Sequence, residues 1–524
     1  MKPQTADLKK LRIGVDVGGT NTDAVVTDDT GDVVAATKTA STPEPIDGIK
    51  AAVAAVLDQV DDPSAVGKAM LGTTHPTNAI IRRQDLDRVG VLRLAAPSSL
   101  GVRPGAAWPE DLQRMVIAHS EIVGGGFEYD GTPIADLDED AVRRFGSSCA
   151  QDVSAIAVSC PFSPAIIDHE LRAAELLAEE CGADFPVSLS HTVGSLGLLE
   201  RENATILNAS LLTVAKRVVA GFRSTLTEAG LEVASFLTQN DGTLMAVDEA
   251  DKYPVLTVGS GPTNSMRGAS TLAGLSDALV IDVGGTSADV GILVDGFPRE
   301  STAAVEVGGV RTNFRMPDLI SVGLGGGSVV RNGDGVAVGP DSVGFDVVTE
   351  AVCMGGSTLT LSDVSLAAGR LEGFGDPGLL AGLDESLTDA AMGWVDQRIG
   401  VLCERMKASS TLLPLIAVGG GAHLVPPTLR GISEVLWPPH HSVANAFGAA
   451  IAEAAGSIDK VYGYDTAGRE ACLDAARAEA EDAAIRAGAD PKQVRITRIV
   501  EIPMTYAPGG RCRVIVKAVG PLGS

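Results

Sequence analysis

The sequence predicts an α/β protein built from two related lobes, followed by a small C-terminal α+β segment. Two segments in different halves of the chain repeat one strand–turn–strand pattern, which indicates two lobes of common design. Short apolar runs alternate with helical periodicities along most of the chain, as in α/β proteins. After residue 456 the sequence changes to an Ala/Glu/Arg-rich helix and two alternating strands. We therefore expect domains at 1–195, 196–456 and 457–524.

The composition of the 524 residues excludes several function classes. Apolar residues make up 45% and charged residues 21%, as in ordinary globular proteins. The net charge of −26 argues against binding to nucleic acid or to an anionic membrane surface. No apolar stretch reaches the ~18 residues of a membrane span, and the seven cysteines form no CxxC pair. We therefore expect a cytoplasmic protein with reduced cysteines and neither a nucleic-acid nor a membrane partner.

The first lobe is expected to open with three strands joined by tight turns. Arg12–Asp16 is an apolar run that stops at Gly18-Gly19, and Ala24–Thr27 and Val33–Ala36 flank a turn at Thr30-Gly31. Apolar spacing predicts further strands and amphipathic helices in this half. These are strands at Val66–Leu71 and Ser154–Val158 and helices at Ile46–Leu57, Ala79–Arg83, Ile166–Glu180 and Glu200–Thr227.

The second half is expected to alternate strands and helices in the same way. Val233–Thr238 and Thr243–Val247 form a hairpin around Gln239–Gly242, whose QNDG sequence is typical of a tight turn. Residues 320–360 are rich in glycine and are expected to be mostly loop. The other expected elements are strands at Leu279–Asp282, Val290–Val294, Leu413–Val418, Val494–Pro503 and Cys512–Val519, helices at Leu383–Ala408, Val443–Ala455 and Ala467–Ala487, and a turn at Tyr506–Gly510.

The repeated pattern is D-V-G-G-T-x-x-x-D, found at Asp16–Asp23 and again at Asp282–Asp289. Two adjacent glycines let the backbone approach a phosphate and point N–H groups at it, and the threonine adds a hydroxyl donor. The first aspartate ends a strand, where it can hold Mg²⁺ through water or orient a nucleophile. One copy is equally typical of a plain Gly-rich turn. Two copies predict half-sites that grip one polyphosphate between the lobes.

A third Gly-rich element follows the apolar run Leu415–Val418. Gly419, Gly420 and Gly421 present bare backbone, against which a nucleoside can lie; a simple tight turn is the alternative. Val258–Pro262 precedes a predicted helix and is a weaker candidate for an anion-binding N-terminus.

The paired loops resemble the two phosphate loops of the actin-like ATPase superfamily, which implies two ribonuclease H-like lobes. The chain more closely resembles the hydantoinase/oxoprolinase family, which includes hydantoinase A subunits. The resemblance covers residues 11 to 455, and the tail is similar to the ending of shorter members. The motifs that carry it are DVGGTNTD (16–23), LGTTHPTNAIIRR (71–83), TVGSGPTNSMRGA (257–269), IDVGGTSADVG (281–291), SVGLGGGSVV (321–330), AVCMGGSTLTLSDVSLAAGR (351–370) and PPHHSVANAFGAAIA (438–452).

This resemblance implies ATP-dependent ring opening of a hydantoin, lactam or related cyclic amide. The ring carbonyl oxygen is phosphorylated to an imidate phosphate, which water then attacks. ATP and Mg²⁺ are the implied cofactors, and a second, hydantoinase B-like or unrelated subunit is an implied partner in what we expect to be an oligomer. The implied catalytic and Mg²⁺-holding residues are Asp16 and Asp282, and the phosphate-binding residues are Gly18, Gly19, Thr20, Asn21, Gly284, Gly285 and Thr286, with Gly419, Gly420 and Gly421 beside the nucleoside.

The sequence departs from the family pattern at two positions near these motifs. Leu71 replaces a histidine that larger relatives often carry, and Asn21 stands where many members have phenylalanine. The chain is also shorter than many hydantoinase A subunits. These departures bear on the substrate more than on the nucleotide.

His75 is a further catalytic candidate, because it follows a core strand on a loop rich in polar groups. We expect it to face the substrate, with Thr73, Thr74 and Asn78 nearby; the alternative is that it caps the Thr77–Arg83 helix. We interpret the adjacent histidines His440 and His441 as helix capping rather than as zinc ligands, since no third ligand is suitably spaced.

Two side chains remain as weaker candidates. Cys353 lacks a neighbouring base in the sequence, which argues against a nucleophile. Asp289 is expected to anchor its loop, whereas Asp23 is either an anchor or a general base.

Three other functions remain open on this sequence. The first is a small-molecule kinase that stops at a stable phosphorylated product. The second is an ATP-using activating subunit of a carboxylase. The third is a nucleotide-switched regulator or chaperone, against which the tail after residue 456 is small for a peptide-binding domain.

Overall fold

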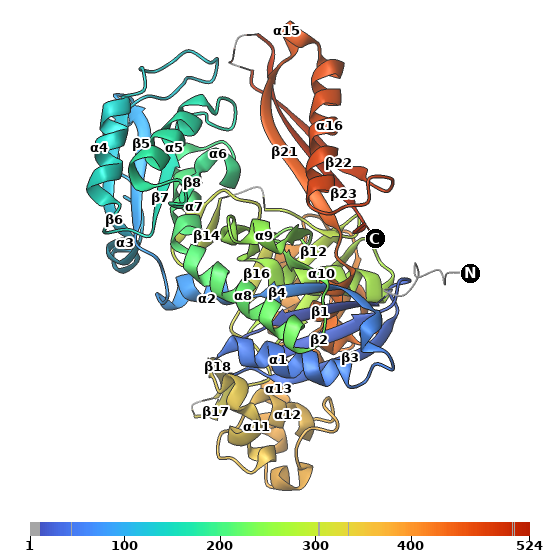
Figure 1. Cartoon of the computed structure of the whole chain (residues 1–524). Helices are drawn as coiled ribbons and strands as arrows, with labels where there is room; N and C mark the ends of the chain where they lie inside the picture. Colours follow the sequence, from blue (N-terminus) through green and yellow to red (C-terminus); the bar gives the residue numbers. More distant parts are fainter. Residues whose placement is uncertain are drawn as a thin grey trace.

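The structure is a computed structural model that describes residues 11–42, 44–301, 304–333, 335–505, 507 and 509–523. Two central mixed sheets are covered by helices, and two smaller units project from them, one around β5–β8 and one formed by the C-terminal strands and α16 (Figure 1). The predicted α/β class is confirmed.

The first sheet has nine strands in the order β22-β23-β21-β10-β9-β4-β1-β2-β3. Helices α1 (Pro45–Leu57) and α8 (Leu212–Glu228) bury their apolar residues against one face of its β1–β4 half. The nine strands are β1 (Leu11–Val17), β2 (Asn21–Thr27), β3 (Val33–Ala40), β4 (Val66–Thr73), β9 (Ala234–Thr238), β10 (Leu244–Ala246), β21 (Ala454–Gly463), β22 (Arg495–Pro503) and β23 (Arg511–Gly520).

The second sheet has the order β13-β12-β11-β19-β20, with β16 also paired to β12. The long helix α13 (Glu385–Met406) covers one face, and α10 (Ser260–Ala273) packs on the other. Its strands are β11 (Ala278–Val283), β12 (Ala288–Val294), β13 (Phe297–Pro298), β16 (Leu319–Val322), β19 (Leu413–Val418) and β20 (Ile432–Leu436).

The two sheets contain the same local arrangement, as the repeated motif predicts. β1 pairs antiparallel with β2 so that Asp16 lies opposite Asp23, and β11 pairs with β12 so that Asp282 lies opposite Asp289. A parallel strand then flanks each hairpin, β4 beside β1 and β19 beside β11. Each first aspartate therefore sits at the carboxyl end of a central strand, where α/β sheets commonly bind ligands.

Helices α10 and α14 (Ala444–Ile451) cross between the two sheets at glycines. A Cβ on Gly268 would lie 2.0 Å from the carbonyl oxygen of Ala444, and one on Gly448 would lie 1.9 Å from that of Asn264. α14 also packs closely on β1, where a Cβ on Gly14 would lie 2.3 Å from the Ala446 carbonyl. Only glycine permits backbones to approach this closely. The crossing therefore brings α10 within reach of both aspartates and α14 within reach of Asp16.

The first projecting unit is a four-stranded parallel sheet in the order β6-β5-β7-β8 with helices around it. An ion pair between Arg93 and Glu202 lies fully inside it, at 2.6 Å. Its elements are β5 (Val89–Ala96), α3 (Glu110–Val116), β6 (Ile117–Gly124), α4 (Glu139–Cys149), β7 (Ala155–Ser159), α5 (Asp168–Cys181), β8 (Val187–Leu189), α6 (Ser190–Val193) and α7 (Leu198–Ser210).

The C-terminal unit extends the first sheet. Helix α16 (Arg469–Arg486) buries small residues against β21 and β23, where a Cβ on Gly456 would lie 2.2 Å from the Ala480 carbonyl. The remaining elements are α2 (His75–Arg82), α9 (Val247–Ala250), the hairpins β14 (Val305–Val307)–β15 (Val310–Thr312) and β17 (Ser328–Asn332)–β18 (Val336–Ser342), and the helices α11 (Val347–Glu350), α12 (Leu361–Ala367) and α15 (Tyr464–Ala467).

Several predicted elements differ from the structure. Residues 320–360 are not mostly loop, because they contain part of β16, the β17–β18 hairpin, α11 and the 3-10 helices Gly344–Asp346 and Val352–Met354. The predicted helix Glu200–Thr227 is broken at Leu211 into α7 and α8, and Val443–Ala455 ends as a helix at Ile451, because β21 begins at Ala454. The predicted turn Tyr506–Gly510 lies partly outside the described residues.

Strands from all three predicted domains belong to the nine-stranded sheet. The domain boundaries at residues 195 and 456 therefore remain predictions.

All seven cysteines are free, as expected. In the described part of the chain, no single helix has the length and apolarity to span a membrane, and α7 and α8 meet that test only as a pair bent by 50°.

Candidate nucleotide site

The two repeated loops face each other. In each loop the first glycine N–H donates to a carbonyl three residues on, Gly18 to Asn21 and Gly284 to Ser287, both at 2.9 Å. A Cβ on Gly285 would lie 2.8 Å from the Thr20 methyl group, so the second loop lies directly against the first. The residues at the loop tips, Gly19 and Thr286, are exposed, and Asn21 donates to the Thr20 hydroxyl at 3.2 Å.

The second loop is supported from behind by the glycine run 325–327. The N–H groups of Gly326 and Gly327 donate to the carbonyls of Gly284 and Gly285 at 3.1 and 2.8 Å. A side chain at Gly325 would collide with the Gly285 backbone, at 2.5 Å. The SVGLGGGSVV segment therefore holds the second loop in place.

Asp16 is almost fully buried at the end of β1. Its two carboxylate oxygens accept from the side-chain amides of Asn264 and Asn445, each at 3.1 Å. Gly72 lies opposite it on β4, where a Cβ would approach the carboxylate to 2.1 Å. Burial raises the pKa of Asp16 to about 6, partly offset by the two amide hydrogen bonds, because an ionised carboxylate loses its hydration there.

Asp282 occupies the equivalent position in the second sheet. Ser265, the residue after Asn264 on α10, donates a hydrogen bond to its carboxylate. Gly419 lies beside it in place of Gly72, with a Cβ position 2.3 Å from the carboxylate. Burial also raises the pKa of this carboxyl group. One turn of α10 therefore contacts both aspartates.

The raised pKa of Asp16 makes stability without ligand depend on pH. Between about pH 4 and pH 6 the folded protein holds a proton that the unfolded chain has released, so the free energy of unfolding falls as pH rises. Asp16→Asn removes this charge, and we expect it to stabilise the nucleotide-free protein by about 1–3 kcal/mol at pH 7.5 but not at pH 4. Urea denaturation of both proteins at the two pH values measures the difference. A stabilisation of equal size at both pH values would contradict the burial of the Asp16 carboxyl group.

The second aspartate of each motif is held by its own strand neighbours. Asp23 forms an ion pair with Lys38 on β3 at 2.6 Å, and Asp289 accepts a hydrogen bond from Ser321 on β16. Burial raises the pKa of Asp289 to about 6. These contacts suit the anchoring role expected for Asp289, and they place Asp23 in a charge pair rather than free as a base.

The third Gly-rich element packs against the second loop. Gly421 donates to the Val283 carbonyl at 2.7 Å and Gly419 to that of His441 at 2.9 Å, whereas the space above Gly420 is open. His423 follows two residues later, and burial lowers its pKa to about 4, so it is neutral at pH 7.

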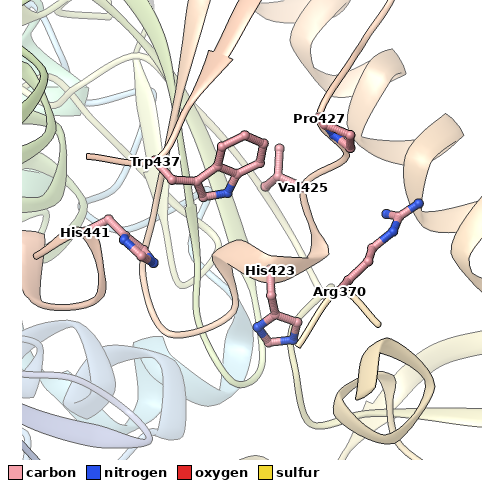
Figure 2. Close-up of a pocket in the computed structure, with 6 residues that line it drawn as sticks. All are labelled: Arg370, His423, Val425, Pro427, Trp437 and His441. Carbon is pink, nitrogen blue, oxygen red and sulfur yellow. The ribbon is translucent and has the colours of Figure 1, made fainter. Parts of the chain in front are cut away.

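A cavity of about 380 Å³ is lined by His423 and the residues that follow it in this segment (Figure 2). Figure 2 shows the indole of Trp437 and the guanidinium of Arg370 extending from different elements. Trp437 donates its ring N–H to the Ala422 carbonyl at 3.1 Å, and Arg370 pairs with Asp396 at 2.7 Å. The cavity is lined by Arg370, His423, Val425, Pro427, Trp437 and His441. A flat aromatic ring and a planar cation are suited to a nucleobase.

His75 lies at the corner between β4 and α2, next to the first loop. Its Nδ1 is 2.6 Å from the Thr73 hydroxyl, and burial lowers its pKa to about 4. Thr74 donates to the carbonyl of Val17, the residue before Gly18, at 3.0 Å, and Asn78 donates to Thr74 at 3.3 Å. The structure thus brings the four predicted substrate residues together. His75 is the first residue of α2 and does not cap a helix that starts at Thr77.

If the cyclic amide expected from the sequence is the substrate, His75→Ala should lower kcat/KM for that compound about a hundredfold and change ATP turnover in its absence little, because the imidazole lies next to the first loop but outside its glycine backbone. Steady-state kinetics with and without the ring compound measure both quantities. An unchanged kcat/KM would remove His75 from the site.

The buried carboxylates suit a hard cation. Asp16 and Asp282 supply oxygen ligands of the kind that Mg²⁺ prefers, and the side-chain oxygen of Asn264 is buried with no hydrogen-bond partner among the described residues. Among the residues that the structure describes, no three or more histidine, cysteine, aspartate or glutamate side chains are grouped so that they could hold a metal ion. His440 and His441 therefore belong to no such group.

Sequence reasoning missed four residues that contact the aspartates: Gly72, Asn264, Ser265 and Asn445. All four lie inside motifs that carry the family resemblance, but nothing in their spacing shows that they meet Asp16 or Asp282. The one available signal was the pair of glycines inside the helices, Gly268 in α10 and Gly448 in α14, since glycine is unfavourable within a helix unless another backbone comes close.

The model described as the hydantoinase/oxoprolinase N-terminal region matches residues 12–181, and the hydantoinase/oxoprolinase model matches residues 201–392. The chain belongs to the hydantoinase/oxoprolinase family. It is 27% identical over 445 residues to caprolactamase subunit alpha of Pseudomonas jessenii, covering 79% of this chain and 62% of that one. It is 29% identical over 397 residues to acetophenone carboxylase gamma subunit of Aromatoleum aromaticum, covering 68% and 53%.

The fold of this family member matches a solved relative over nearly its whole length. The crystal structure of ATP-dependent caprolactamase from Pseudomonas jessenii aligns with a TM-score of 0.75 at 21% identity, covering 98% of this chain and 88% of that chain. The chain spans roughly half to three-fifths of the length of the curated relatives it matches.

Proposed function

We propose that this protein uses Mg-ATP to phosphorylate the carbonyl oxygen of a hydantoin, lactam or related cyclic amide, which leads to ring opening. The observation that carries the proposal is the placement of two D-V-G-G-T loops against each other, with buried Asp16 at the base of one and partly buried Asp282 at the base of the other. This arrangement offers backbone N–H groups and carboxylates from two sides to one polyphosphate. The cavity lined by Arg370, His423 and Trp437 provides room for the nucleoside.

In this proposal the chain's own residues position the reactants. Glycine N–H groups and the Thr20 and Thr286 hydroxyls bind phosphate oxygens, and Asp16 and Asp282 hold Mg²⁺ through water. The bound cation supplies charge neutralisation between the phosphates. The carbonyl oxygen of the ring forms a bond to the γ-phosphorus while the bond to ADP breaks. His75, neutral at pH 7, lies where it can hydrogen-bond the ring next to the first loop.

Phosphorylation suits an amide substrate because amides are poor electrophiles. An imidate phosphate has a good leaving group, so water can attack a carbon that otherwise reacts slowly. The relative named ATP-dependent caprolactamase supports a cyclic amide as the substrate class.

A second candidate is an ATP-using subunit of a carboxylase, which the likeness to acetophenone carboxylase gamma subunit favours. Both curated relatives are named as subunits, which supports a second polypeptide, of the hydantoinase B kind or unrelated, as partner in an oligomer.

Product analysis after incubation with Mg-ATP and a panel of hydantoins, 5-oxoproline and simple lactams tests the proposal. A ring-opened acid with equal amounts of ADP and phosphate is expected. A stable phosphorylated ring compound would indicate a kinase instead. ADP formation that requires a ketone and a partner protein would favour the carboxylase role.

A further inference from the structure

Three side chains form a row across β1, β2 and β3, which lie side by side in the first sheet (Figure 1). Asp16 on β1 lies opposite Asp23 on β2, and Asp23 lies opposite Lys38 on β3. Residues directly opposite one another on neighbouring strands place their side chains on the same face of a sheet. Lys38 therefore faces the same side as the two aspartates, and no step of the proposed reaction uses it.

The end of β3 also supports the first D-V-G-G-T loop. Ser41, which follows β3, donates its backbone N–H to the Thr20 carbonyl and its hydroxyl to the Gly18 carbonyl, both at 3.0 Å. Lys38 lies near this end of the strand. The strand that carries the lysine is therefore bound directly to the first loop.

The Lys38 ammonium group lies close to carboxylates of both lobes. Its Nζ is 2.6 Å from each carboxylate oxygen of Asp23, whose side chain is almost fully buried. Burial raises the pKa of Asp282 in the second lobe, and the positive charge of Lys38 opposes that rise. Among the residues that the structure describes, no other basic side chain lies within 4 Å of Asp16, Asp23 or Asp282. Lys38 is therefore the cation of this cluster.

The ammonium group has a donor to spare. An ammonium carries three N–H donors, and the described residues offer it two acceptors, the carboxylate oxygens of Asp23. The Lys38 side chain is 29% exposed, so a further acceptor can reach it. A lysine ammonium binds phosphate oxygens as a compact point charge.

The corresponding row in the second sheet ends in an uncharged residue. There Asp282 on β11 lies opposite Asp289 on β12, and Asp289 lies opposite Ser321 on β16. The Ser321 hydroxyl donates to Asp289, in the place where Lys38 pairs with Asp23. The duplicated row therefore carries a cation in the first sheet and a hydroxyl in the second, so the two half-sites differ in charge.

This difference suits the two ends of one nucleoside triphosphate. The cavity proposed for the nucleoside is lined by side chains of the second lobe, whereas the residues expected to face the ring compound lie next to the first loop. In this arrangement the γ-phosphoryl group lies on the side of the first loop, where the cation is.

We propose that Lys38 binds an oxygen of the γ-phosphoryl group of ATP and stabilises the negative charge on that group during its transfer. The inference rests on the proposed function. The ammonium keeps its three protons throughout. It donates a hydrogen bond to the phosphoryl group while the ring oxygen bonds to phosphorus and the bond to ADP breaks. Lys38 is then a catalytic residue, and Asp23 is the positioning residue that holds it.

The test compares the affinities of the full chain for ADP and for the non-hydrolysable β,γ-imido analogue of ATP, both with Mg²⁺, by calorimetric titration. Lys38→Met alone would leave Asp23 buried without its cation. The substitution is therefore made together with Asp23→Asn, and Asp23→Asn alone is the reference. We expect the ratio of analogue affinity to ADP affinity to fall at least about tenfold in the double variant relative to this reference, with ADP affinity within about twofold. An ion pair with a purely structural role predicts no difference between these two variants.

Turnover gives a second readout. At saturating Mg-ATP and ring compound, we expect the double variant to release ADP about a hundredfold more slowly than Asp23→Asn. Lys38→Arg keeps the charge and should retain more of the wild-type rate than Lys38→Met. Lys50→Met is the matched control, because Lys50 also pairs with a carboxylate, Glu228 at 2.9 Å, but joins α1 to α8 outside the row. It should keep the wild-type affinities and rate.

Equal affinity ratios in Asp23→Asn and in the double variant would overturn the inference and leave the proposed function standing. The converse result is also distinct. If no ring compound increases ADP release by the wild-type chain, while the double variant still loses its affinity ratio, the proposed function is overturned and the contact between Lys38 and the γ-phosphate is supported. Failure of the wild-type chain to bind either nucleotide would overturn both.

Discussion

Asp16→Ala is expected to lower ring-stimulated ATP turnover by at least about a thousandfold. The carboxylate sits at the base of the first loop, in the space that Gly72 leaves open on β4. Loss of a preorganised group that acts on the transferring phosphoryl group commonly has an effect of this size. Initial-rate ADP release at saturating Mg-ATP measures it.

The control for this variant is Asp29→Ala, an exposed aspartate in the turn between β2 and β3. It should keep wild-type turnover. Near-normal activity in Asp16→Ala would contradict the placement of the site at the two loops. The variant should fold, because removal of a buried charge with a raised pKa does not destabilise the nucleotide-free protein.

Gly448→Ala is expected to destabilise the protein by about 2–4 kcal/mol and to abolish nucleotide binding. The added methyl group would overlap the Asn264 carbonyl oxygen, so α10 and α14 must move apart. Asn264 and Ser265 on α10 and Asn445 on α14 then lose their contacts with the two aspartates. Urea denaturation and calorimetric titration with Mg-ATP measure the two effects.

Gly393→Ala provides the matched helical control. Gly393 lies inside α13 with open space around its Cβ position, so alanine should leave binding intact and raise stability by up to about 1 kcal/mol. Equal effects of the two substitutions would show that helix propensity, and not the crossing, determines the result.

Local patterns were enough to predict the parts of the fold that depend on neighbours in the sequence. The antiparallel hairpin β1–β2 and its copy β11–β12 follow from apolar strands around paired glycines, and their register places Asp16 and Asp282 alike. The QNDG hairpin likewise follows from its turn residues. These features need no knowledge of distant contacts.

Features that depend on tertiary packing could not be predicted. The continuous helical periodicity across Leu211 gave no sign of the break between α7 and α8. The sequence after Ile451 reads as helix, yet β21 begins at Ala454, because that segment pairs with both β10 and β23 inside the first sheet. In both segments, contacts with other elements determined the secondary structure, because local propensity is too weak to override them.

At the candidate nucleotide site, too, local features could be predicted from the sequence and tertiary contacts could not. Both D-V-G-G-T loops were found from their own residues, whereas Asn264 and Asn445 reach Asp16 only through the helix crossing. Ser265 likewise reaches Asp282 only because α10 passes beside both aspartate strands. Pairs of this kind become visible only when the fold brings them together.

The most direct test of the central claim is ADP release by the wild-type chain with Mg-ATP, compared with and without hydantoins, 5-oxoproline and simple lactams. We expect at least one cyclic amide to increase the rate severalfold, and the increase to be absent in Asp16→Ala. No ATP binding and no ADP under any of these conditions would contradict the claim that the two loops form a nucleotide site.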